Sequence, residues 1–83
     1  MSIVNILSIL PLARVNYMIT YEPFYQTLFK KGLTEYSLIF KQGFSAATLH
    51  RMKKGQGITL KTLDTLCFIL DCDITDIIKY KKE

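Results

Sequence analysis

Apolar residues recur at three- and four-residue intervals over most of this chain, which is the spacing of one face of an α-helix. The clearest stripe begins after Thr59 and falls on Leu60, Leu63, Leu66, Cys67 and Leu70. No stretch alternates apolar and polar positions with period two for long, as a half-buried strand does. The pattern therefore predicts an all-α fold.

Capping residues divide this pattern into five short helices. Hydroxyl and carboxylate side chains at a helix start accept backbone N–H groups, proline is tolerated in the first turn, and glycine commonly ends a helix. The predicted starts are Pro23, Thr34, Ser45, Thr59 and Asp73, and glycines end the first three helices at Gly32, Gly43 and Gly55. The last helix is expected to carry Ile74, Ile77 and Ile78. Short connections of this kind are typical of a compact helical domain.

Residues 1–17 differ in composition from the rest of the chain. The run Ile3–Leu10 is apolar and uncharged and precedes Pro11. It is too short to span a bilayer, which needs about 20 apolar residues, and it lacks the basic start of a signal peptide. Three interpretations remain open. The run is either an arm that packs on the domain or on a second subunit, where it would serve dimerisation, or a membrane-surface segment. The third interpretation, which we favour, is an upstream extension of a domain formed by residues 18–83.

The composition fits one small globular domain. The chain has 83 residues, of which 49% are hydrophobic, so one modest core is expected and wholesale disorder is not. Its two cysteines, Cys67 and Cys72, lack metal-ligand or redox-motif spacing, and we expect reduced, partly buried thiols in a cytoplasmic protein. His50 is the only histidine, so the sequence offers no metal cluster or catalytic triad, and we expect no enzyme, cofactor, metal or small-molecule ligand.

Charge is distributed unevenly around the modest net value of +4. Residues 30–61 contain seven bases and one acid, Glu35, whereas residues 62–78 contain four acids and no base. A chain of this kind can present its basic region to a polyanion.

The second and third predicted helices, joined by a tight turn, carry the main functional signal. Gly43 suits that turn because the chain needs a positive φ there. Five apolar residues around the turn can meet in one small core: Leu38, Ile39, Phe44, Leu49 and Met52. The outward face of the third helix, from about Ser45 to Lys54, is then slim, basic and rich in hydrogen-bonding groups. That composition favours insertion into a groove over packing.

These two helices resemble the helix-turn-helix of the lambda-repressor and Cro-like family, often called XRE-type. The similarity lies in Leu33-Thr34 at the entry, Leu38-Ile39, the Gly43-Phe44-Ser45 turn, Thr48-Leu49 in the third helix, and Gly55 at its end. The later stretches Leu60–Leu63 and Leu66–Ile78 look like the fourth and fifth helices of that family. The resemblance thus covers about Ile19 to Tyr80, is greatest for short stand-alone members, and implies a compact five-helix DNA-binding domain.

The resemblance also implies roles for single residues. Ala46, Ala47, His50 and Arg51 stand where the family faces base edges, and Ser45, Thr48, Lys53 and Lys54 are placed for phosphate contacts. Arg51 is the strongest candidate because a guanidinium can bond guanine bidentately. Two departures weaken tight binding by a monomer: Glu35 stands where the family has a phosphate-contacting glutamine, and two alanines replace long polar readers.

We therefore expect a sequence-specific transcriptional regulator that binds double-stranded DNA as a homodimer on a pseudo-palindromic operator. The alternative is a protein-interaction module or antitoxin-like partner with the same fold and weak or lost DNA binding. RNA binding is less favoured because the basic face lacks stacking aromatics.

Overall fold

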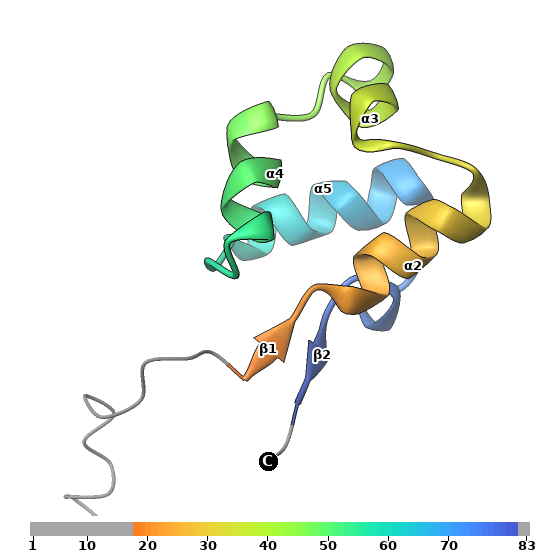
Figure 1. The fold of residues 1–83 in the computed structure, drawn as a ribbon. Coiled ribbons are helices and arrows are strands. Elements are labelled where there is room, and N and C mark those ends of the chain that lie inside the picture. Colours follow the sequence, from red (N-terminus) through yellow and green to blue (C-terminus); the bar gives the residue numbers. More distant parts are fainter. Residues whose placement is uncertain (1–17, 82–83) are drawn as a thin grey trace, which may run out of the picture.

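The structure, a computed structural model, describes residues 18–81 as four α-helices, one 3-10 helix and two short strands (Figure 1). In chain order the elements are β1 (Ile19–Thr20), α2 (Glu22–Lys31), α3 (Glu35–Gln42), α4 (Ala46–Lys53), α5 (Leu60–Leu70), η2 (Ile74–Asp76) and β2 (Lys79–Tyr80). The prediction of a compact, mainly helical domain is confirmed.

The predicted hydroxyl caps begin three of the helices. The side chains of Thr34, Ser45 and Thr59 each accept the backbone N–H three residues later, at 3.1 Å in every case. Each cap satisfies one of the N–H groups that the first helical turn leaves unpaired. Sequence alone therefore located the starts of α3, α4 and α5.

Every helix from α2 to α5 is followed within two residues by a residue with positive φ. Three of these residues are glycines, including Gly43 with φ 72° between α3 and α4. The fourth is Asp71 with φ 51°, the one non-glycine residue with positive φ in the described part of the chain. Such an end lets later N–H groups return to the last helical carbonyls; that of Phe44, for example, donates to Leu38 at 2.9 Å.

The helices enclose one hydrophobic core. Its fully buried members come from every α-helix and from the chain after η2: Phe24, Leu38, Leu49, Met52, Leu66, Leu70 and Ile77. Phe44 in the turn is also buried, and Ile39 packs against the cluster partly exposed. The small core predicted around the α3–α4 turn thus exists, and it is continuous with the core beneath α2 and α5.

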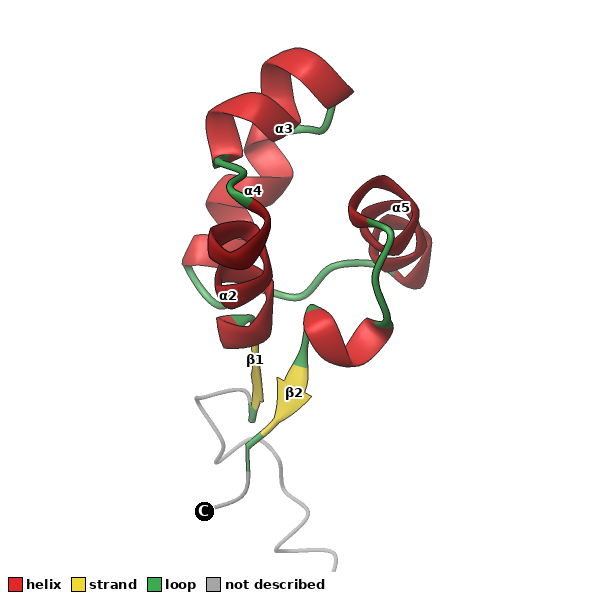
Figure 2. Ribbon diagram, turned by 90° about the vertical axis from the view of Figure 1, so that its right-hand side faces the viewer, coloured by secondary structure: helices red, strands yellow, loops and turns green. Residues whose placement is uncertain are grey.

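The end of the domain differs from the prediction. Asp73 does start a helix, but η2 has only three residues, and Ile77 and Ile78 lie beyond it. The chain then becomes extended, and β2 pairs antiparallel with β1, Ile19 opposite Tyr80 (Figure 2). Pairing with β1 at the other end of the domain requires this extended backbone, so a longer helix has no room to continue.

Leu60 also departs from its predicted place in the core. Leu63, Leu66 and Leu70 of α5 are buried, whereas Leu60 in the first turn is 82% exposed. The apolar stripe is therefore one turn shorter than the sequence suggested.

Both cysteines are free and partly exposed, as predicted. Burial raises the pKa of the Cys67 and Cys72 thiols, so both favour the neutral thiol form. Residues 1–17 lie outside the described part, so the structure does not test the interpretations of the Ile3–Leu10 run. Within residues 18–81, no helix has the length and apolar character needed to cross a membrane.

Candidate nucleic-acid interface

Helix α4 has two sides of opposite character. Leu49 and Met52 point into the core and are each 2% exposed, which fixes the rotation of the helix. Four residues on the remaining surface are all exposed: Ala46, Ala47, His50 and Arg51. These are the predicted base-reading residues, and the structure brings them together on one narrow face.

Arg51 is oriented by its own helix. Its guanidinium donates to the Thr48 hydroxyl at 3.3 Å, one turn earlier. Thr48 itself is only 7% exposed. The structure thus places Thr48 behind the surface instead of on it, where a phosphate contact had been predicted. Its hydroxyl is positioned to hold the Arg51 side chain along the helix.

The other predicted phosphate-contacting residues lie at the two ends of α4. Ser45 is exposed and caps the N-terminus, where unpaired N–H groups and the helix dipole favour an anion. Lys53 and Lys54 are exposed at the C-terminal end. The three residues therefore flank the predicted base-reading surface at both ends of the helix.

Lys53 forms an ion pair with Glu35. Its ammonium group lies 3.2 Å from Glu35 Oε1, in a pair whose side chains are 60% and 26% exposed respectively. This ion pair connects the start of α3 to the end of α4. The one acid of the basic region therefore neutralises one of the predicted phosphate contacts.

The same carboxylate influences Tyr25 on α2. Burial, followed by the neighbouring charge of Glu35, raises the pKa of the Tyr25 phenol. The Tyr25 hydroxyl and Glu35 Oε2 are both buried, yet neither completes a hydrogen bond with the described residues. Tyr25, Glu35 and Lys53 thus form one polar cluster that joins α2, α3 and α4.

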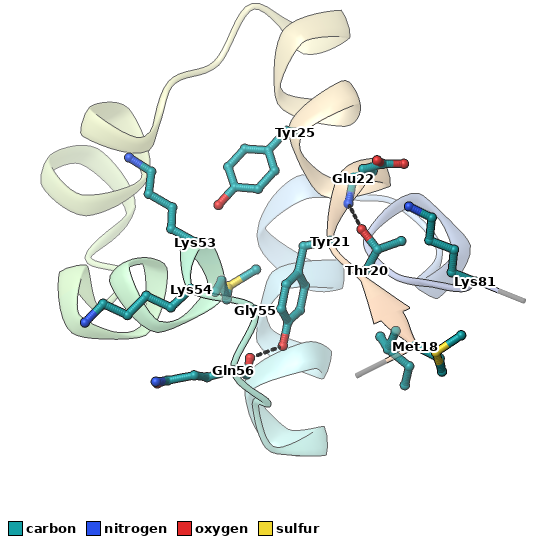
Figure 3. Close-up of a pocket in the computed structure, with 12 residues that line it drawn as sticks. Met18, Thr20, Tyr21, Glu22, Tyr25, Lys53, Lys54, Gly55, Gln56 and Lys81 are labelled. Atoms are coloured by element: carbon teal, nitrogen blue, oxygen red, sulfur yellow. Dashed lines mark hydrogen bonds between the residues drawn. The ribbon is translucent and has the colours of Figure 1, made fainter. Parts of the chain in front are cut away.

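A hollow of about 590 Å³ lies beside the C-terminal end of α4 (Figure 3). Across it the Tyr21 hydroxyl donates to the Gln56 carbonyl oxygen at 2.6 Å. This bond ties the loop after α4 to the start of α2, 35 residues earlier in the chain. The C-terminal end of α4 is thereby held at two points: Glu35 pairs with Lys53, and Tyr21 bonds the loop that follows.

The comparisons with known proteins agree with this geometry. Residues 26–83 match the family model of the Cro/C1-type HTH DNA-binding domain. The chain belongs to this family. A crystal structure of the transcriptional regulator VanUg is similar, with a TM-score of 0.70 and 26% sequence identity over 80% of this chain and 88% of that one. Curated proteins give no significant match.

Within this Cro/C1-type domain, α3 and α4 are the two helices of the helix-turn-helix. The sequence predicted the exposed face of α4 and showed that Glu35 is unusual for the family. Neither the ion pair with Lys53 nor the contact between Tyr21 and Gln56 was predictable from it. Both depend on how separate helices pack, and no spacing along the sequence signals them.

Proposed function

We propose that this Cro/C1-type domain is a sequence-specific transcriptional regulator that inserts α4 into the major groove of double-stranded DNA. The observation that carries the proposal is the exposed face of α4, which is slim, uncharged at its start and basic at its end. A helix must project from its domain and carry small or hydrogen-bonding side chains to enter the groove. Both conditions are met at Ala46, Ala47, His50 and Arg51.

Each residue then has a distinct role. Arg51 reads guanine through a bidentate hydrogen bond, and Thr48 holds it in position. Ala46 and Ala47 offer apolar contact to thymine methyl groups, and His50 lies between them and Arg51 on the same face. Ser45, Lys53 and Lys54 contact phosphates, which fixes register without reading sequence.

The proposal includes a homodimer in the cytoplasm. Helix α4 has eight residues, so it is about 12 Å long. One such helix with one strong base reader provides little specificity. Two helices related by a two-fold axis would read half-sites about 34 Å apart on a pseudo-palindromic operator. The likeness to VanUg, described as a transcriptional regulator, supports regulation as the outcome.

Selection of bound sequences from a random DNA pool, followed by a salt titration on the selected duplex, tests the proposal. We expect affinity to fall steeply with salt, because phosphate contacts release counterions. Arg51→Ala should weaken binding by about 1–3 kcal/mol and relax the preference at one base of each half-site. Lys30→Ala on α2 removes a cation outside the proposed interface and is the control.

Two results would overturn the proposal. Absence of duplex binding at low salt would favour the alternative, a protein-interaction module or antitoxin-like partner. Preference for single-stranded RNA over the selected duplex would indicate a different nucleic-acid target.

A further inference from the structure

An apolar surface surrounds β1, on residues that play no part in the proposed DNA contacts. Two hollows of about 240 and 470 Å³ adjoin there and share Ile19 and Ile78 in their walls. Ile58, Leu60 and Leu63 extend the first hollow toward α5, and Tyr80 extends the second along β2. We call this surface the β1 hollow.

Large apolar side chains of the β1 hollow remain exposed among the described residues. Leu60 is 82% exposed, Tyr80 58% and Ile19 48%. Single exposed apolar residues are ordinary, but a contiguous group around a depression marks a place where another surface binds.

The chain itself provides an apolar segment at the right place. Six of the eight residues in Ile3–Leu10 are isoleucine, leucine or valine, and none is charged. Leu10 precedes Met18 by eight residues, a length that spans about 26–29 Å when fully extended. Met18 directly adjoins Ile19, which lines both parts of the hollow. The segment is therefore attached at the edge of the surface by a tether long enough to fold back onto it.

We propose that Ile3–Leu10 docks into the β1 hollow of its own chain. The alternative occupant is the same segment of a second copy, which must be recruited from solution. A short tether raises the local concentration of the attached segment to about the millimolar range, so the segment of the same chain competes best. The inference depends on the fold and not on the proposed DNA binding.

The docked segment would also support the DNA-binding side of the domain. Gly55 and Gly57, in the loop that follows α4, contribute to the wall of the hollow. A segment seated there would restrict this loop beside Tyr21, which lines the same hollow. The N-terminal run would then act as an additional part of the core and not as a dispensable extension.

Methyl-resolved NMR on the full 83-residue chain tests the docking directly. We expect nuclear Overhauser contacts between methyl groups of Ile6 or Leu7 and those of Ile78 or Leu60. In a mixture of labelled and unlabelled chains, these contacts must remain intramolecular. Contacts seen only between chains would overturn the proposal in favour of a second copy, and their absence would overturn docking altogether.

Matched variants separate docking from general effects. Ile6→Asp places a charge in the apolar run and should abolish the contacts, whereas Asn5→Asp adds the same charge at a polar position and should preserve them. On the other side, Leu60→Gln should weaken the contacts and Phe68→Gln should not, because both residues lie exposed on α5 but only Leu60 lines the hollow.

Thermal unfolding gives a second readout for the same variants. Ile6→Asp should lower the Tm by about 5 °C or more, the order expected when a small domain loses buried apolar contacts. Equal Tm values for Ile6→Asp and Asn5→Asp would contradict the proposal. DNA affinity is not part of this test, so failure here leaves the proposed function untouched.

Discussion

Helices α4 and α5 follow the same local rules but serve different purposes. Each begins after a hydroxyl cap and is closed by a residue with positive φ, Asp71 directly after α5 and Gly55 one residue later, after Lys54, in α4. α4 has eight residues and exposes alanines and basic side chains, while α5 has eleven and buries three leucines. Capping determines where a helix lies along the chain. The side chains between the caps determine whether that helix is presented to a partner or holds the domain together.

Truncating a buried leucine of α5 should have the largest effect on the free energy of unfolding. Leu66 is fully buried at the centre of the core, and a leucine-to-alanine change at such a site costs about 2–5 kcal/mol. Small domains have roughly 5–15 kcal/mol in total. Leu66→Ala should therefore unfold at a much lower urea concentration, and it should lose DNA binding only through unfolding.

Phe68→Ala on the same helix is the matched control. Phe68 is 84% exposed, so its truncation should change the free energy of unfolding by less than about 0.5 kcal/mol. If the two variants unfolded at the same urea concentration, α5 would not be the main support of the core.

The sequence predicted the features that depend on neighbouring residues. Thr34, Ser45 and Thr59 locate helix starts because a cap bonds only three residues away. The strands were missed, since β1 and β2 have two residues each and pair across about 60 positions of the chain, Ile19 with Tyr80. No period-two pattern can develop over two residues.

The site shows the same division between local and long-range information. The exposed face of α4 was predictable from the positions of Leu49 and Met52, because one buried stripe fixes the rotation of a helix. The burial of Thr48 beside that stripe was not, since it depends on how closely the neighbouring helices approach. Likewise, Glu35 was recognisable as unusual, but its pairing with Lys53 required the packing of α3 against α4.

A change at the end of α5 should have a smaller effect and should stabilise the domain. Asp71 adopts φ 51°, a conformation that costs an L-residue about 1–2 kcal/mol and glycine little. Part of that gain is offset by the greater freedom of glycine in the unfolded chain. Asp71→Gly should therefore raise the free energy of unfolding by roughly 0.5–1 kcal/mol in urea titrations.

Gly43→Ala tests the same backbone effect in the opposite direction, between α3 and α4. A Cβ at Gly43 would meet no atom within 4 Å, so its cost of about 1 kcal/mol would come from the positive φ alone. A destabilised Asp71→Gly variant would contradict this account, because it would show that the Asp71 side chain contributes more than its backbone costs.

The smallest expected effect on stability comes from a change at Glu35, which pairs with Lys53 at the end of α4. Glu35→Gln removes the charge that pairs with Lys53 and that repels a nearby phosphate. Exposed ion pairs contribute only about 0–1 kcal/mol to stability, so unfolding should change little. DNA affinity should instead rise by up to about five-fold, because an ion pair of this strength no longer competes with the phosphate contact of Lys53.

Salt dependence shows whether Lys53 is the reason for that gain. One additional phosphate contact makes the slope of log affinity against log salt steeper by about 0.9. In a Lys53→Gln background, Glu35→Gln should therefore lose its effect on the slope and most of its gain in affinity. Asp64→Asn removes an exposed acid from α5 and should change neither quantity. If it raised affinity as much as Glu35→Gln, net charge alone would account for the effect, and the ion pair between α3 and α4 would have no part in it.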